Sequence, residues 1–124
     1  MIKMVVTVYR KPGMAWETFE PRWRDVHGEL VKSLASAMGF KKYVQSHFQP
    51  SSDIESFAAI RGWLPPPEGL AEVYWDSVEE MRQALSSPEG QAASQILAKD
   101  EAEFVDMTRV SAFLSVEHVV FDHT

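Results

Sequence analysis

The sequence predicts a small domain of the α+β class, in which four antiparallel strands form a sheet and the helices cover one of its faces. Three observations support this class. At 124 residues, the chain has the commonest size of a single domain with one hydrophobic core. Its 45% hydrophobic and 24% charged residues are typical of a globular protein. Segments with strand alternation and with helical spacing follow one another in the order strand, helix, strand, strand, helix, strand.

The first strand and the first helix are predicted in the N-terminal third of the chain. Residues 2–9 are β-branched and apolar and end at a turn signal, Arg10-Lys11-Pro12-Gly13. Side chains at spacings of three and four then indicate one face of a helix: Phe19, Trp23, Val26, His27, Leu30 and Leu34. Thr18 is the expected N-cap, because that start places Pro21 in the first turn, where its missing N–H costs nothing. Gly39 is the expected end of this helix.

The middle of the chain combines two predicted strands with a long loop. Residues 42–48 and residues 70–75 have the composition of strands. Between them, residues 49–69 are rich in proline, serine and glycine and predict a loop insertion, with a short helical turn around residues 54–60. A loop of this length in a compact domain is either functional, for example as a lid, or a surface insertion.

Two helical segments and a last strand are predicted in the C-terminal half. A capping box at residues 77–80 opens a short helix, and Ser87-Pro88 starts a second helical stretch that runs toward Phe104. Residues 109–121 alternate and are rich in valine, which predicts the last strand. The complete order of elements is the split βαβ arrangement of the ferredoxin-like βαββαβ fold.

One face of such a sheet has no helices to cover it. The last strand contributes one alternating set of apolar side chains to that face, either Val110, Ala112, Leu114, Val116 and Val120 or the opposite set that contains Phe113. A large apolar sheet face is rarely left in water. We therefore expect a second copy of the chain to cover it, which gives a homodimer.

The composition excludes several partners and compartments. Acidic residues outnumber basic ones by 18 to 12, and the net charge of −6 repels phosphate, so nucleic acid is not an expected partner. The absence of cysteine excludes disulfides and thiolate chemistry and fits a reducing compartment. No apolar run is long enough for a signal peptide or a membrane span, so we expect a cytoplasmic protein without a membrane partner.

Several local signatures together resemble one family. They are Arg10-Lys11-Pro12-Gly13, Phe19 followed by Trp23-Arg24-Asp25-Val26-His27-Gly28, Tyr43-Val44-Gln45-Ser46-His47, Ala71-Glu72-Val73-Tyr74-Trp75-Asp76-Ser77, Ser86-Ser87-Pro88-Glu89-Gly90, and Asp100 with Phe104-Val105-Asp106. With these residues the chain resembles an EthD-type protein of the dimeric α/β-barrel superfamily, as one domain over residues 1–124. The loop at 49–69 is longer than the family usually has.

The resemblance implies two sheets packed face to face in a dimer, with a pocket in each subunit between the sheet and the helices. Members of the wider superfamily include muconolactone-type isomerases, cofactor-independent oxygenases of polyketide pathways and fungal dehydratases. Their shared theme is a small, often aromatic or lactone-like ligand that is handled without a cofactor. The same kind of ligand is therefore expected here, with no cofactor.

His27 is the leading candidate for catalysis. It lies four residues after Trp23 on the first helix, so it can reach a pocket beside the sheet. An imidazole with an ordinary pKa of about 6.5 can move a proton between carbon and oxygen. The alternative is a half-buried histidine that bonds to backbone or to an acid such as Asp25, and the family motif favours the catalytic interpretation.

The second strand offers further candidates, because Tyr43, Gln45 and His47 share one of its faces. If that face meets the helices, Tyr43 and His47 can act with His27 on an oxygen of the substrate, and Gln45 can bind it. The alternative makes Tyr43 a core aromatic and His47 a residue at the rim. Three tryptophans are candidates for binding an aromatic ligand, although large aromatics are also common in a plain core: Trp23, Trp63 and Trp75.

A metal site is not expected, because the four histidines do not fall at helical ligand spacing: His27, His47, His118 and His123. A hydrolase elbow and a phosphate-binding glycine loop are also missing from the sequence. The acidic residues Asp100, Glu101, Glu103 and Asp106 are interpreted as a solvated helix face, with Asp106 as a residue that could orient a partner.

These observations predict a cofactor-independent enzyme that acts on a small cyclic or aromatic metabolite. Dehydration or isomerisation by general acid–base catalysis at His27 is preferred. The alternatives are a cofactor-independent oxygenase of aromatic polyketide-type substrates, and a non-catalytic ligand-binding accessory protein of a catabolic pathway. Haem binding, which occurs in some related barrels, is a further alternative.

Overall fold

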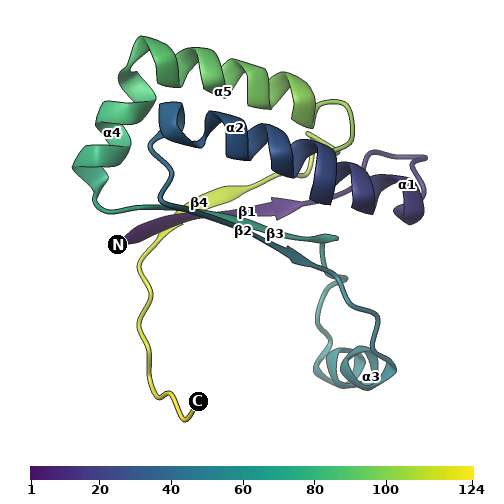
Figure 1. The fold of residues 1–124 in the computed structure, drawn as a ribbon. Helices are drawn as coiled ribbons and strands as arrows, with labels where there is room; N and C mark the ends of the chain where they lie inside the picture. Colours follow the sequence, from purple (N-terminus) through teal and green to yellow (C-terminus); the bar gives the residue numbers. More distant parts are fainter.

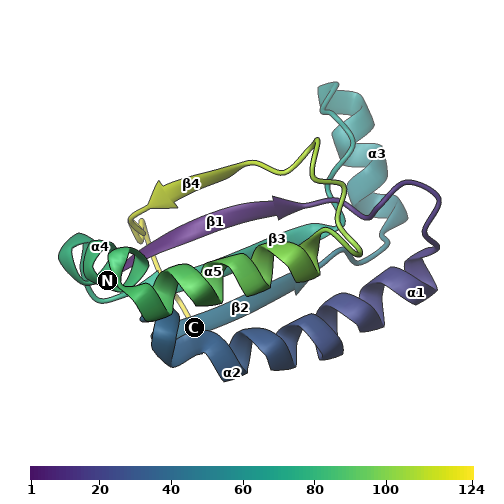
Figure 2. The same cartoon turned by 90° about the horizontal axis from the view of Figure 1, so that it is seen from above.

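The computed structural model describes residues 1–124 and has the predicted ferredoxin-like fold (Figures 1 and 2). The elements are β1 (Ile2–Val8), α1 (Trp16–Pro21), the π-helical turn η1 (Arg22–His27), α2 (Gly28–Met38), β2 (Lys42–His47), α3 (Ser52–Arg61), β3 (Gly69–Trp75), α4 (Val78–Ser86), α5 (Pro88–Glu101) and β4 (Ala112–Ser115). The sheet has the order β2-β3-β1-β4 with every pair antiparallel. Helices α2 and α5 pack side by side over one face, and β4 lies at the edge beyond α5 (Figure 2). None of the helices has the length and apolar character needed to cross a membrane.

The start of the first helix differs from the prediction. It begins at Trp16 rather than after Thr18, so Pro21 lies inside the helical segment. A proline there removes one hydrogen bond and its ring clashes with the carbonyl four residues earlier. The chain widens directly after Pro21 into η1, and then returns to α-helical geometry at Gly28. This interruption is tolerated because it occurs where Trp23 and His27 are buried against the rest of the protein.

The segment between β2 and β3 contains more helix than the short turn that was expected around residues 54–60. Ser51 accepts a hydrogen bond from the N–H of Ile54 at 3.2 Å and caps the ten-residue helix α3. No side chain of α3 is buried, because this helix extends away from the sheet on the side opposite to α2 and α5 (Figure 1). The last strand is also shorter than predicted, since β4 ends at Ser115 and the remaining residues extend on the same side as α3 (Figure 1).

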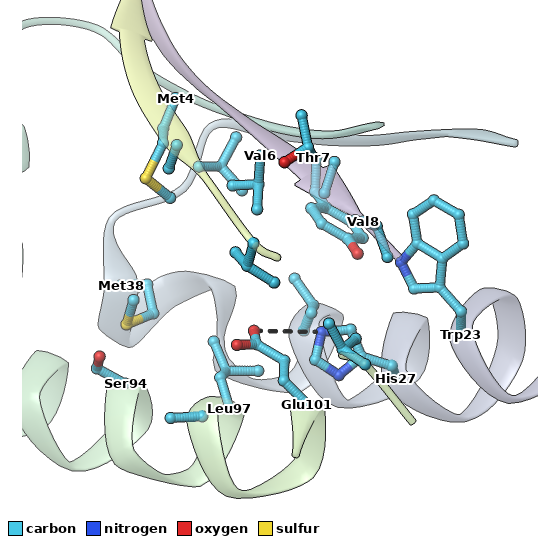
Figure 3. Close-up of a pocket in the computed structure, with 18 of the residues that line it drawn as sticks. Met4, Val6, Thr7, Val8, Trp23, His27, Met38, Ser94, Leu97 and Glu101 are labelled. Carbon is cyan, nitrogen blue, oxygen red and sulfur yellow. Dashed lines mark ion pairs between the residues drawn. The ribbon is translucent and has the colours of Figure 1, made fainter. Parts of the chain in front are cut away.

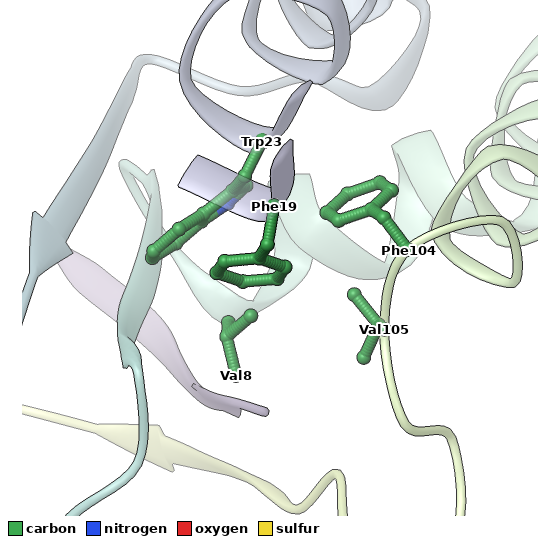
Figure 4. Packing of buried hydrophobic residues seen from close by; sticks show 5 residues of the cluster. All are labelled: Val8, Phe19, Trp23, Phe104 and Val105. Atoms are coloured by element: carbon green, nitrogen blue, oxygen red, sulfur yellow. The ribbon is translucent and has the colours of Figure 1, made fainter. Parts of the chain in front are cut away.

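The core near the site is built mainly of aromatic side chains. Val8 of β1, Phe19, Trp23, Phe104 and Val105 form one buried cluster (Figure 4). The ring centroid of Phe19 lies 5.7 Å from that of Trp23 and 5.9 Å from that of Phe104. Each such side chain contributes roughly 1.5–3 kcal/mol by burial, so this cluster ties the first helix to the segment after α5.

The two faces of the sheet differ in polarity. Alternate side chains of β1, among them Met4 and Val6, point toward the helices, and β4 pairs with them through Leu114 and Ala112. The set that contains Phe113 therefore lies on the uncovered face. That face is less apolar than predicted, because Lys3 of β1 and Glu72 of β3 form an ion pair of 2.5 Å at its centre.

Candidate active site

An apolar cavity of about 250 Å³ lies between the sheet and the helices α2 and α5 (Figure 3). Four residues of its lining are polar or charged, namely Thr7, His27, Ser94 and Glu101, and Tyr43 adds a phenol group. The remaining lining is hydrophobic and comes from all four strands, from η1, α2 and α5, and from the segments that follow α2 and α5. A few polar groups in an apolar cavity are typical of a small-molecule site.

The position of His27 in this cavity is fixed by the ion pair between Asp100 and Arg22. The side chain is the only buried polar one of the molecule, at 5% exposure. Its Nδ1 lies 2.8 Å from Oδ2 of Asp100 on α5. Asp100 also accepts two hydrogen bonds from Arg22, at 2.5 and 3.2 Å. Because the carboxylate is an acceptor, Nδ1 carries the proton and donates it, which leaves the lone pair of Nε2 directed at the cavity.

The pKa values of His27 and Asp100 are both lowered, but for different reasons. The pKa of His27 is lowered, mainly by burial, although the hydrogen bond and charge of Asp100 oppose this effect. The pKa of Asp100 is lowered, first by its hydrogen bond to Arg22. At neutral pH the site therefore contains a neutral imidazole whose far nitrogen is held by a carboxylate. This is the arrangement of a general base.

Glu101 was assigned to a solvated helix face by the sequence, and this assignment is wrong. The residue lines the cavity, and its Oε2 lies 3.7 Å from Nε2 of His27 (Figure 3). Burial and the neighbouring charge of Asp100 raise the pKa of Glu101 to about 7. A signal was present in the sequence, because Ala93, Leu97 and Glu101 recur at a spacing of four and share one face of α5.

Tyr43 lies in the cavity, whereas Gln45 and His47 lie behind it. The side-chain amide of Gln45 donates hydrogen bonds to the Tyr43 hydroxyl at 2.9 Å and to the Trp23 carbonyl at 3.0 Å. The oxygen of the same amide accepts from Nε2 of His47 at 2.7 Å. Since the Tyr43 oxygen already accepts a hydrogen bond, its own proton is free to bind a ligand. Burial is the main cause that raises the pKa of Tyr43, so the phenol stays protonated.

His47 does not touch the cavity and sits in a separate polar group. Its ring stacks on Trp23 with centroids 4.3 Å apart and an interplanar angle of 15°. Its Nδ1 faces the carboxylate of Glu20 at 2.8 Å, and Glu20 in turn pairs with Arg24. These contacts fix the position of the Trp23 ring from the side away from the cavity.

The three tryptophans predicted to bind a ligand have three different environments. Trp23 is buried and lines the cavity. Trp75 is also buried but lies outside the lining, where its indole N–H donates to the carbonyl of Met38 at 3.0 Å. Trp63 is 59% exposed after α3 and contacts Phe57 rather than the cavity.

No group of three His, Asp or Glu side chains comes together in a geometry that could hold a metal ion. His118 and His123 lie in the exposed C-terminal segment. His27 has only Asp100 and Glu101 as acidic neighbours.

The sheet, the paired helices and the buried imidazole between them define a ferredoxin-like α+β protein with an internal small-molecule cavity. The EthD domain model matches residues 11–108, and the chain therefore belongs to the EthD family. This confirms the resemblance found in the sequence. No functionally curated protein matches the chain.

Solved structures share the fold at low sequence identity. An EthD family protein from Bacillus halodurans has a TM-score of 0.61 and 18% identity, over 95% of this chain and 100% of that one. A dimeric ferredoxin-like protein of unknown function from Bacteroides fragilis has a TM-score of 0.58 and 12% identity, over 92% and 93%. A mutant of SnoaB, a cofactor-independent oxygenase from Streptomyces nogalater, has a TM-score of 0.52 and 13% identity, over 98% and 97%.

Proposed function

We propose that the protein is a cofactor-independent enzyme that transforms a small cyclic or aromatic metabolite by general acid–base catalysis at His27. The observation that carries this proposal is the orientation of the imidazole. Asp100, which is itself bound by Arg22, accepts the proton of Nδ1, and Nε2 faces an apolar cavity in which a substrate C–H or O–H can meet it.

Tyr43 supplies the second element of the mechanism. When His27 removes a proton from carbon next to a carbonyl group, negative charge develops on the carbonyl oxygen. The free hydroxyl proton of Tyr43 can donate to that oxygen inside the cavity. A donor placed at a developing oxyanion in a water-poor site contributes about 3–4 kcal/mol to catalysis. A substrate with an acidic C–H beside a carbonyl is therefore the class that this cavity suits.

The size and lining of the cavity limit the substrate further. A dry cavity of about 150 Å³ accommodates a benzene ring. The cavity of about 250 Å³ thus suits a molecule of one or two rings. Its polar groups are few, and those that can act on a substrate belong to His27, Tyr43 and Glu101. One carbonyl, lactone or phenol group on an otherwise apolar ring therefore fits best. Dehydration and isomerisation of such a molecule need only proton transfer.

Oxygenation is the second candidate. SnoaB, whose fold is similar, is described as a cofactor-independent oxygenase. In such a reaction His27 would deprotonate an electron-rich aromatic substrate, and molecular oxygen would be the co-reactant that oxidises the resulting anion. Oxygen consumption separates this candidate from dehydration and isomerisation.

The experiment is hydrogen–deuterium exchange in D₂O, followed by NMR, with a panel of cyclic ketones, lactones and phenols. We expect the wild-type protein to accelerate exchange next to the carbonyl of at least one compound. His27→Gln should lower that rate by about 10²-fold or more. Glu89→Gln, a change at an exposed acid outside the cavity at the start of α5, should leave it unaltered. Binding without exchange would contradict the enzyme and support the accessory protein.

We also propose that the protein is a homodimer. Large hydrophobic side chains are exposed on α3, after it and in the C-terminal segment: Ile54, Phe57, Ile60, Trp63, Leu64, Val119, Val120 and Phe121. Both segments extend on the uncovered side of the sheet (Figure 1). A second copy placed there would bury them together. Sedimentation should give a dimer, and Ile60→Asp should weaken it about tenfold or more, unlike Glu89→Gln on α5. A monomer at all concentrations would contradict this proposal.

A further inference from the structure

The carboxyl group of Glu101 has no cationic partner, and the basic side chain beside it is the neutral imidazole of His27. No lysine or arginine lies within ion-pair distance of it, whereas Asp100 beside it binds Arg22. The Glu101 side chain instead lines the apolar cavity together with His27 and Tyr43. The side chain is 38% exposed, and its remaining part lies among apolar groups, where a carboxylate loses hydration and the protonated acid is favoured.

The distance between the Glu101 carboxyl group and the His27 ring leaves both groups free to act on a substrate. Oε2 of Glu101 and Nε2 of His27 are 3.7 Å apart, which is too long for a hydrogen bond between them. Each group therefore keeps its proton or lone pair available for a third atom. The same distance allows a proton to pass between them after a small movement of either side chain. Both groups lie on the helix side of the cavity, so they face the same side of a bound ring (Figure 3).

We propose that Glu101 is a second catalytic residue, which delivers a proton to the substrate after His27 has removed one. This inference rests on the proposed function and assigns the reaction to proton transfer between two positions of one substrate. The raised pKa of Glu101, about 7, means that a proton is available for delivery near neutral pH.

A β,γ-unsaturated cyclic ketone would be isomerised by three proton transfers. His27 Nε2 takes a proton from the carbon between the carbonyl and the double bond, and the C–H electron pair forms the dienolate. Glu101 then gives its proton to the far carbon of the original double bond, which produces the conjugated ketone. The imidazolium finally returns its proton to the Glu101 carboxylate. No oxidant, reductant or added proton is consumed, so the pair is ready for the next substrate.

Elimination of water follows the same scheme. His27 removes the proton next to the carbonyl, and Glu101 protonates the hydroxyl group on the following carbon as its C–O bond breaks. Water leaves with the proton from Glu101, and the imidazolium again restores the carboxyl group. The pair thus serves isomerisation and dehydration, but it gives no role to molecular oxygen.

The experiment measures two rates on one probe, cyclohex-3-en-1-one, in D₂O by NMR. One rate is deuterium exchange at the carbon between the carbonyl and the double bond, and the other is formation of cyclohex-2-en-1-one. Glu101→Gln keeps the size of the side chain but cannot deliver a proton. We expect it to lower the second rate at least tenfold more than the first. Glu89→Gln, which changes an exposed acid at the start of the same helix, serves as the control.

Other outcomes distinguish failure of the Glu101 inference from failure of the proposed function. If Glu101→Gln lowers both rates by the same factor, the residue only maintains the site, and the inference is overturned. It is also overturned if neither rate changes. If His27→Gln abolishes exchange while Glu101→Gln has no effect, the proposed function survives without it. If the wild-type protein promotes neither process on any compound of the panel, the proposed function fails and the inference fails with it.

Discussion

Asp100 and Glu101 are neighbours in the sequence, yet they contact opposite nitrogens of the His27 ring. Oδ2 of Asp100 lies 2.8 Å from Nδ1, and Oε2 of Glu101 lies 3.7 Å from Nε2. The first carboxylate is kept ionised by Arg22, whereas burial raises the pKa of the second to about 7. Two residues of the same chemical kind thus differ in protonation at neutral pH.

Asp100→Asn should reduce catalysis without removing the base itself. Asp100 is a positioning residue, which fixes the tautomer and orientation of His27, and loss of such a carboxylate lowers activity by up to about 10⁴-fold. It also raises the pKa of His27 against the effect of burial. The acidic limb of the rate profile should therefore move to lower pH in the variant, an effect that simple loss of stability does not produce. Asp76→Asn, a change at an exposed residue after β3, is the control.

Glu101→Gln should change how stability depends on pH. The folded protein keeps the Glu101 proton up to a pKa of about 7, whereas the unfolded chain ionises near the ordinary value of 4.5. The wild-type protein therefore loses stability as pH rises from 4.5 through 7. The variant lacks this loss, so its Tm relative to wild type should be higher at pH 8 than at pH 4.5. Because the side chain is 38% exposed, solvent screening reduces the effect to about a few degrees at most. Circular dichroism melting at both pH values tests this. A Tm difference that does not vary with pH would contradict it.

Tyr43→Phe should separate catalysis from packing. The ring remains in place, but the proton that can bind a substrate oxygen is lost. We expect the exchange rate to fall about 10²-fold. The free energy of unfolding should fall by only about 1 kcal/mol, because the Gln45 amide keeps its bond to the Trp23 carbonyl. Exchange kinetics and urea unfolding measure the two effects. An unchanged exchange rate would remove Tyr43 from the mechanism, and Tyr9→Phe outside the cavity is the control.

Gly69→Ala should prevent correct packing of the strand behind the site. A Cβ atom at Gly69 would collide with the carbonyl oxygen of Ser46 and would lie 2.8 Å from the Trp23 ring. Neither group can move easily, so we expect a loss of more than about 3 kcal/mol in the free energy of unfolding. Gly28→Ala is the matched control, because its Cβ would make only ordinary contacts, with the Gln45 amide at 3.5 Å and the Trp23 carbonyl oxygen at 3.8 Å. Urea unfolding should show the contrast, and equal effects of both changes would contradict it.

Much of the fold follows from local patterns. Strand alternation and helical spacing identified the sheet strands and α2, and the two serine caps act as expected. Ser77 accepts from the N–H of Glu80 at 3.1 Å, and Ser87 accepts from that of Gly90 at 3.0 Å. The predicted start of the first helix was wrong. The prediction considered the cost of Pro21 inside a helix but not the free energy gained by burying Phe19 and Trp23.

The site could be predicted only in part. His27 and Tyr43 lie in the cavity, and both belong to segments with clear periodicity. Asp100 and Glu101 were taken for solvated residues, because charged side chains near the end of a helix usually face water. Their role depends on how α5 packs against η1, which lies 73 residues away from Asp100 along the chain. Local sequence patterns do not contain that relationship.

The π-helical turn after Pro21 limits how the chain can change in length. Such a turn corresponds to an α-helix with one additional residue. Deleting one residue within Arg22–His27 would therefore leave a regular helix, but it would rotate the preceding turn by about 100° relative to the following one. Phe19 and His27 could then no longer face the core and the cavity at the same time. In related chains, we expect insertions and deletions to be excluded from this stretch, even though a continuous helix would form more easily without its additional residue.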